Sequence, residues 1–322
     1  MKNQLSIHRY TLHSRGSLNA KSARQKHHGA LVRVEDDKVV GYGCIHPWPE
    51  LGDVNLERTL ELLVAGEYTA LSARALQCAA ADGVARRDKV SLFAGLPIPR
   101  SHASLMMDAD DLKRAVEAGF TVVKLKVGRD PAPEIDFIRE QAGKYPELKW
   151  RLDFNGVLVE QEVERFLAGL GEELRQKIDF IEDAYRLRST PWVDALGPYD
   201  IPMAVDREVA DACGDFGVAV IKPALHKPRP IMSRAVKEPR RFVFTSYLDH
   251  PLGQCFAAWE AGVALRSFPG VVDTCGLVTH GLFEPNAFAE ALGPPRPDFH
   301  APEGTGLGFD QLLEALPWKP LE

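Results

Sequence analysis

The pattern of apolar positions changes near Pro99, and the two parts of the chain predict different structures. Before this point, residues 4–13 and 30–45 form strand-like runs, and a polar turn divides the second run into a hairpin. From residue 53 to about residue 88, apolar side chains recur at helical spacing and alanine is frequent. The segment before Pro99 therefore predicts a few antiparallel strands followed by helices, an α+β unit.

After Pro99, short apolar runs alternate with amphipathic segments. The apolar runs occupy residues 102–107, 121–127, 149–153, 178–182, 201–206, 218–222 and 242–246. The segments between them include residues 109–118, 135–144, 160–170 and 252–261. This alternation predicts βαβ units and a parallel sheet. With a ragged eighth strand at 263–272 it predicts a (β/α)8-type barrel, which needs about 200 residues. An open doubly wound sheet is the alternative, and the lack of a G-x-G-x-x-G motif after the first strand disfavours it.

Six of these runs carry a polar side chain at or next to their carboxyl end. These residues are Lys126, Asp153, Glu182, Asp206, Lys222 and Ser246. In a barrel, the carboxyl ends of the strands meet at one mouth, where barrel enzymes have their active sites. The two-residue period of a strand also places Lys124 on the face of Lys126, and Arg151 and Asn155 on the face of Asp153. One such residue is more often part of an ion pair, but six in register predict a site.

The chemistry of these residues indicates a metal-assisted reaction. Burying a carboxylate or an ammonium at a strand end is costly unless the charge is paired or bound to a metal. Three carboxylates without cysteine or histidine beside them suit a hard cation such as Mg²⁺. Lys126 and Lys222 on opposite sides of that cation can act as acid and base, because a nearby cation and desolvation lower a lysine pKa. Lys124 is then an electrostatic support for Lys126.

Composition and charge narrow the range of functions. The 322-residue chain has 45% hydrophobic and 26% charged residues, which is typical of a globular protein. Its net charge of −6 argues against a duplex-binding protein. We expect neither a membrane span nor a secretory signal, and therefore a cytoplasmic protein. The five scattered cysteines predict free thiols. We expect a small carboxylate as substrate and no nucleic-acid or membrane partner.

The strand-end motifs resemble those of the enolase superfamily, in its muconate-lactonizing subgroup. The resemblance rests on the motifs KLK at 124–126, RLDFN at 151–155, FIE at 180–182, AVD at 204–206 and VIKP at 220–223. Within the subgroup the chain looks most like the o-succinylbenzoate synthases, because of the R-x-D-x-N motif, the short length, the Ser246 strand end and the segment 268–274. This implies a modified TIM barrel, (β/α)7β-like, at 96–303. The α+β capping domain would comprise 1–95 and the tail at about 304–322.

The resemblance also implies a role for each residue. Asp153, Glu182 and Asp206 would bind Mg²⁺ or Mn²⁺. Lys126 would remove the α-proton and protonate the leaving hydroxyl, and Lys222 would stabilise the enediolate, the known chemistry of such lysine–magnesium sites. The supporting residues would be Lys124, Arg151 and Asn155, and Ser246 would bind substrate. The reaction would be the syn dehydration of 2-succinyl-6-hydroxy-2,4-cyclohexadiene-1-carboxylate in menaquinone biosynthesis, catalysed by a lyase.

The chain departs from the family pattern at two places next to the acids. Asp183-Ala184 follows Glu182 where Glu-Pro is frequent, and Arg207 follows Asp206 where an acid is usual. These departures affect the expected charge around the site but not the three acids. The polar and basic stretch at 14–28 is either a solvated loop or a lid, from which Arg24 or Lys26 would meet the succinyl carboxylate.

Three other functions use some or all of the same residues. An N-acylamino acid racemase or dipeptide epimerase needs Lys126 and Lys222 as two opposed bases. A Schiff-base aldolase needs one lysine and no metal, which leaves the three carboxylates unexplained. A scaffold without activity is disfavoured, because unused buried charges would only reduce stability.

Overall fold

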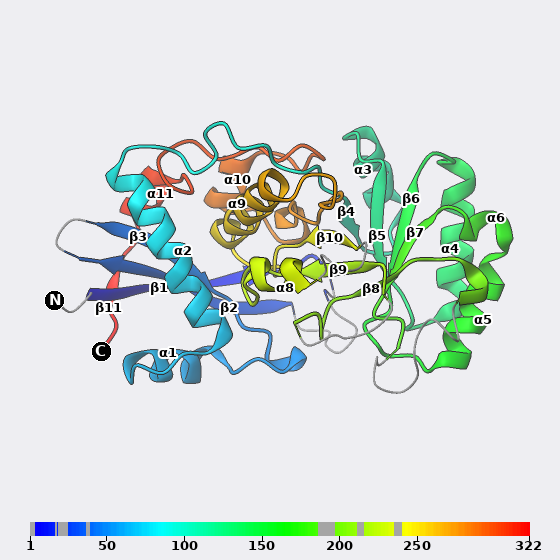
Figure 1. The fold of residues 1–322 in the computed structure, drawn as a ribbon, viewed down its shortest axis with the longest axis horizontal. Helices are drawn as coiled ribbons and strands as arrows, with labels where there is room; N and C mark the ends of the chain where they lie inside the picture. Colours follow the sequence, from blue (N-terminus) through cyan, green and yellow to red (C-terminus); the bar gives the residue numbers. More distant parts are fainter. Residues whose placement is uncertain are drawn as a thin grey trace.

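The computed structural model describes residues 4–16, 18, 25–36, 39–185, 197–210, 216–234 and 240–322. Within these residues the chain forms a four-stranded antiparallel sheet, in the left half of Figure 1, and a seven-stranded parallel sheet, which runs from the centre toward the right. The predicted α/β fold class, a modified barrel with an α+β cap, is confirmed.

The antiparallel sheet joins the beginning of the chain to its end. Its order is β11-β1-β2-β3, formed by Lys319–Pro320, Gln4–His13, Lys26–Glu35 and Val40–Ile45. β2 begins at Lys26, so the end of the predicted basic loop is strand, and the Lys26 side chain is exposed. Arg24 lies outside the described residues. Since β11 pairs with β1, the C-terminal tail contributes to this sheet.

Two helices cover one side of this sheet. They are α1 (Leu56–Val64) and α2 (Ala70–Arg87), and a short 3-10 helix, η1 (Pro49–Leu51), precedes them. α2 packs closely on β3 because Gly41 and Gly43 face it. A Cβ at Gly41 would lie 1.9 Å from the Ala79 carbonyl oxygen, so no larger residue fits there without moving the helix. The alanine-rich helix and the two glycines therefore belong to one contact.

The parallel sheet has the strand order β10-β9-β8-β7-β6-β5-β4. In chain order the strands are β4 Ala103–Leu105, β5 Val122–Lys126, β6 Lys149–Asp153, β7 Ile178–Glu182, β8 Met203–Val205, β9 Val218–Ile221 and β10 Arg241–Phe244. The register pairs Lys126 with Asp153, and Asp153 with Glu182. Three of the predicted site residues are thus neighbours on adjacent strands.

The barrel is closed by an irregular segment later than the predicted eighth strand. The prediction placed that strand at 263–272, but helix α9 continues to Ser267. The closing segment instead bridges β10 through Val272, the residue after β10 (Thr245) through Gly276, and Ser101 through Cys275. Backbone hydrogen bonds from His102 N to the Cys275 carbonyl (2.7 Å) and from Gly276 N to the Phe244 carbonyl (2.7 Å) fix both edges.

Helices connect most of the strands and cover the outside of the parallel sheet (Figure 1). They are α3 Ala109–Glu117, α4 Pro131–Lys144, α5 Glu160–Leu170, α6 Glu172–Arg175, α8 Pro228–Arg234, α9 Pro251–Ser267, α10 Ala287–Leu292 and α11 Asp310–Glu314. Two further 3-10 turns are η2 Gly197–Tyr199 and η4 His280–Leu282. Local caps explain several starts: the Asp108 carboxylate accepts two backbone N–H groups at the start of α3, and prolines occupy the first turns of α4 and α9.

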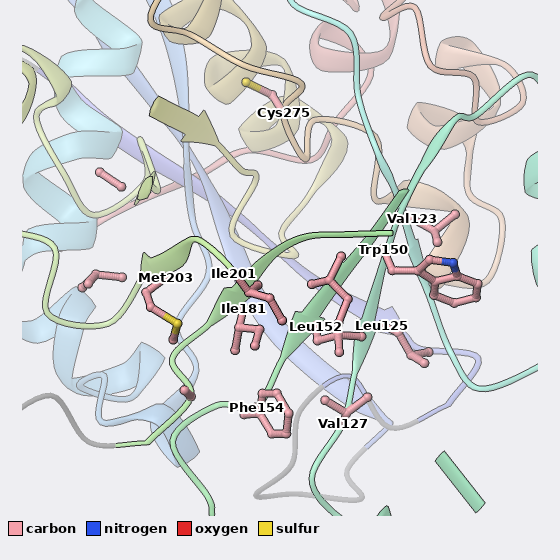
Figure 2. Close-up of a cluster of buried hydrophobic side chains, with 14 of the residues drawn as sticks. Val123, Leu125, Val127, Trp150, Leu152, Phe154, Ile181, Ile201, Met203 and Cys275 are labelled. Carbon is pink, nitrogen blue, oxygen red and sulfur yellow. The ribbon is translucent and has the colours of Figure 1, made fainter. Parts of the chain in front are cut away.

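Side chains on the two faces of the parallel strands pack in two different hydrophobic clusters. Val123, Leu125, Leu152 and Ile181 belong to the large cluster between the sheet and the helices, and Figure 2 shows them together. The interior cluster contains Phe180, Ala204, Val218, Val220 and Val243. The lysines and acids share the interior face, so the apolar interior cluster lies beneath them along the same strands.

The chain before Pro99, here called the N-terminal unit, and the barrel share hydrophobic clusters. Ile7, Ile45 and Trp48 cluster with Tyr247 and Phe283 of the later chain. The division into domains at residue 95 stays a prediction. The described helices include none long and apolar enough to cross a bilayer. Four cysteines are buried free thiols, and Cys213 lies outside the described residues.

Candidate active site

A cavity of 580 Å³ lies at the carboxyl ends of the barrel strands, beneath residues of the N-terminal unit. The predicted site residues that line it are Lys124, Lys126, Asp153, Asn155, Asp206, Lys222 and Ser246. Leu18, Trp48 and Asp53 contribute from the N-terminal unit. Glu182 and Arg151 are only 1% exposed and lie behind the cavity wall.

The three acids are held by two lysines. Lys124 Nζ lies 3.0 Å from Asp153 Oδ2 and donates to Glu182 Oε1 at 2.5 Å. Burial alone would lower the pKa of Lys124, but the charges of Asp153 and Glu182 outweigh it and raise that pKa. Lys222 Nζ forms an ion pair with Asp206 Oδ2. Both lysines are therefore bound to the predicted metal ligands.

Lys126 lies in a different environment from the other two lysines. Its Nζ donates to the backbone carbonyl of Leu18 at 2.5 Å. Burial lowers the pKa of Lys126 to about 8, and the ammonium groups of Lys124 and Lys222 contribute. Of the three lysines, Lys126 is thus the one best suited to lose a proton near neutral pH.

The two departures from the family pattern contact each other. Asp183 Oδ1 accepts the backbone N–H of Asp206 at 3.1 Å, and Arg207 Nε lies 3.8 Å from Asp183 Oδ2. Arg207 also donates to the side-chain oxygen of Asn155 at 3.2 Å. Burial raises the pKa of Asp183 to about 7, and the Asp206 charge adds to this effect. The arginine therefore balances an acid that faces the metal-ligand candidates.

Asn155 and Arg151 occupy different depths of the barrel. Asn155 Nδ2 donates to Asp153 Oδ1 at 2.6 Å and so orients a predicted ligand. Arg151 instead donates to Asp179 (2.7 Å), His102 Nδ1 (2.8 Å) and the Thr274 carbonyl (2.7 Å). Its guanidinium thus connects three segments of the barrel interior below the cavity and does not contact the three acids.

Several cavity residues were not predicted from the sequence. Because a guanidinium only donates, His102 Nδ1 must accept from Arg151, so the proton lies on Nε2. That nitrogen and Thr245 Oγ1 are buried without a hydrogen-bond partner among the described residues, and both side chains line the cavity. Ser246 Oγ is hydrogen-bonded to Thr279 Oγ1 at 2.6 Å. The two-residue period of β10, continued by one residue, could have predicted Thr245, because Thr245 then shares the interior face with Val243.

The donor set suits a hard cation, although the acids do not converge on one point. Among the described residues, no three acidic, histidine or cysteine side chains gather closely enough to bind one ion. Each acid has an ammonium as a neighbour instead. Asp206 Oδ1 is buried with no hydrogen-bond partner in the described part of the chain. Three carboxylates, one with an unused buried oxygen, fit the chemistry of Mg²⁺.

Comparisons with known proteins agree on one family. Residues 5–85 match the family model described as the O-succinylbenzoate synthase N-terminal domain. The chain is 32% identical to an o-succinylbenzoate synthase from Bdellovibrio bacteriovorus, over 99% of both chains.

Solved structures share the fold at lower identity. One is the muconate lactonizing enzyme from Pseudomonas fluorescens with muconolactone (TM-score 0.75, 16% identity, 95% of both chains). Another is the dipeptide epimerase from Methylococcus capsulatus with Mg and the dipeptide L-Arg-D-Lys (TM-score 0.75, 17% identity, 96% of this chain and 99% of that chain). At these identities the likeness concerns the fold alone.

Proposed function

The chain belongs to the o-succinylbenzoate synthase family, and from that premise we propose how its own residues carry out the reaction. The reaction is the syn dehydration of 2-succinyl-6-hydroxy-2,4-cyclohexadiene-1-carboxylate to o-succinylbenzoate. The product ring is aromatic, which favours the reaction. We further propose that the product serves menaquinone biosynthesis.

Lys126 is the base in this proposal. Its pKa of about 8 allows a neutral amine near neutral pH, and its Nζ donates to a backbone carbonyl without an ion pair to any carboxylate among the described residues. Lys126 takes the α-proton of the substrate and then gives a proton to the leaving hydroxyl. Because the elimination is syn, one amine can reach both groups from the same face of the ring.

Lys222 acts as the partner of Asp206 in this proposal. Its ammonium is paired with Asp206 and stabilises the negative charge that develops on the substrate. This difference between Lys126 and Lys222 is the single observation that favours dehydration, which needs one base. Racemisation needs two, and the dipeptide epimerase neighbours support that alternative only as distant relatives of the same fold.

Asp153, Glu182 and Asp206 would hold a magnesium ion. Burial raises the pKa of Glu182 to about 8 despite the Lys124 ammonium, and a bound cation would compensate that cost. When bound, Mg²⁺ supplies positive charge that neutralises the substrate carboxylate and makes its α-proton more acidic. Asn155 orients Asp153 through its 2.6 Å hydrogen bond.

A direct assay tests this proposal. Purified protein is given the hydroxy-cyclohexadiene carboxylate while o-succinylbenzoate is followed by absorbance. We expect rapid conversion by the wild type, none by Lys126→Ala, and strongly reduced conversion by Lys222→Ala, with all three proteins folded by circular dichroism.

The same proteins are then offered a panel of N-acylamino acids, and optical rotation is followed. Racemisation faster than dehydration would overturn the proposed function. Retained dehydration by Lys126→Ala would overturn the assignment of the base.

A further inference from the structure

Three side chains join the N-terminal unit to the barrel at the cavity wall. Trp48 and Asp53 flank η1, and Tyr247 follows β10. Asp53 Oδ2 accepts hydrogen bonds from the Trp48 backbone N–H and from the Tyr247 hydroxyl, both at 2.8 Å. Trp48 Nε1 donates to the Tyr247 carbonyl, also at 2.8 Å. We call these three residues the clasp.

The clasp fixes the orientation of the Tyr247 ring. The Tyr247 hydroxyl donates to Asp53, and the Tyr247 backbone carbonyl accepts from Trp48. The side chains of Trp48 and Tyr247 also pack in one hydrophobic cluster. Trp48 is 1% and Tyr247 5% exposed. Both ends of the tyrosine are therefore tied to a unit that is more than 190 residues away in sequence.

The face of that ring is turned toward Lys222. Lys222 Nζ lies 5.7 Å from the ring centroid, within the range in which an aromatic face attracts an ammonium. Nζ also forms an ion pair with Asp206. The ammonium thus lies between a carboxylate and an aromatic ring, and only the ring is anchored to the N-terminal unit.

We propose that Tyr247 is a positioning residue for Lys222, and that Asp53 of the N-terminal unit holds it in place. The effect on turnover rests on the proposed function, because it requires Lys222 to act in the reaction. The N-terminal unit then does more than line the cavity, because its contact with the barrel also sets the position of Lys222.

Tyr247→Phe tests the proposal because it removes the anchoring hydroxyl and keeps the ring. We expect kcat to fall about tenfold, since a small misplacement of a catalytic group is costly, while KM changes less. Tyr199→Phe is the matched control: its hydroxyl donates to the Glu164 carbonyl at 3.4 Å, away from the cavity, and we expect no change in kcat. Equal losses in both variants, or a rise in KM alone, would overturn the proposal.

Substitutions of Asp53 supply the conservative comparison. Asp53→Asn keeps a side-chain oxygen that can accept from Tyr247, whereas Asp53→Ala does not. We expect Asp53→Ala to match Tyr247→Phe, Asp53→Asn to lose less, and the double variant Asp53→Ala/Tyr247→Phe to be no worse than either single change. Additive losses in the double variant would contradict a shared action through one hydrogen bond.

A measurement without turnover separates the clasp from the proposed function. Lysines are acetylated with acetic anhydride, and modification of Lys222 is followed by peptide mass spectrometry, with the exposed Lys149 as internal control. We expect Tyr247→Phe to raise the modification rate of Lys222 severalfold and to leave Lys149 unchanged. An unchanged rate at Lys222 would overturn the clasp, even in a protein that dehydrates normally. An increased rate in a protein without dehydratase activity would support the clasp and reject the proposed function.

Discussion

The lysines of the cavity differ in their partners rather than in their residue type. Lys124 and Lys222 are bound to carboxylates, whereas the Lys126 ammonium faces a backbone carbonyl. A carboxylate partner keeps an ammonium charged, and burial without such a partner favours the neutral amine. Side chains that look equivalent along the sequence are thus suited to opposite tasks.

This difference predicts the pH dependence of the reaction. Only neutral Lys126 can accept a proton, so kcat/KM is expected to rise as pH increases toward about 8 and to level off above it. A bound cation would move the inflection lower, because positive charge disfavours the ammonium. The measurement is kcat/KM between about pH 6 and pH 10, with circular dichroism at each pH as a control for unfolding. A rate that falls as pH rises through this range would contradict the assignment of Lys126 as base.

Gly276 occupies a position that admits no side chain. A Cβ there would lie 2.8 Å from His102 Nε2 and 2.8 Å from Thr245 Cγ2, and Arg151 holds the histidine ring. We expect Gly276→Ala to reduce stability by about 1–3 kcal/mol and to narrow the cavity, raising KM. Gly143→Ala is the control, because nothing lies within 4 Å of its Cβ in α4 and alanine favours a helix. Urea denaturation compares the two variants, and equal stability would contradict the tight fit at Gly276.

At the scale of elements, the alternation of side chains made most of the barrel predictable. The predicted bounds of β6, β7 and α5 match the structure, because each is a short, uninterrupted pattern with a single period. The eighth strand was misplaced because α9 continues with apolar residues to Ser267 and resembles a buried strand. The true closing segment contains Asp273, Thr274 and Gly276 and makes only isolated bridges, so it carries no strand pattern.

Charged side chains of β6 and β7 also pair with each other in the barrel interior, below the cavity. Arg151 lies against the Phe180 ring, and Asp179 accepts from both Arg151 and Arg241 at 2.7 Å. Arg151→Met would leave His102 and a partly buried carboxylate without this partner. We expect the free energy of unfolding to fall by about 3 kcal/mol, against less than about 0.5 kcal/mol for the exposed Arg139→Met. A loss of similar size in both variants, measured by urea denaturation, would contradict the structural role of Arg151.

At the scale of the whole molecule, the cavity is a joint product of two units. The sequence predicted the strand-end lysines and acids because one period places them, but not Leu18, Trp48 or Asp53, which reach the cavity only through tertiary packing. Tyr247 belongs to the same class, since its role depends on a residue of the N-terminal unit. No local pattern encodes such contacts.

Asp249 makes the stability of the whole fold depend on pH. It precedes α9, is 4% exposed, and burial raises its pKa to about 7. In the unfolded chain the pKa of Asp249 is about 4. Protonation of Asp249 therefore favours the folded state. This contribution to the free energy of unfolding is fully present below about pH 4 and is lost as pH rises through about 7. We expect Asp249→Asn to stabilise the protein at about pH 8, by up to about 4 kcal/mol, with a smaller gain at about pH 5. The exposed Asp136→Asn is the control in thermal denaturation. A gain that is larger at the lower pH would contradict the sign of this effect.

In the proposed reaction, Lys126 is the catalytic base beside a magnesium ion held by Asp153, Glu182 and Asp206. The most direct measurement is the initial rate of o-succinylbenzoate formation by protein stripped with EDTA, as Mg²⁺ is added back. We expect the rate to be lost without metal and to return as Mg²⁺ is added, and Asp206→Asn to need a higher Mg²⁺ concentration for the same fraction of its maximal rate. Full activity of the metal-free wild type would show that the reaction needs no bound cation.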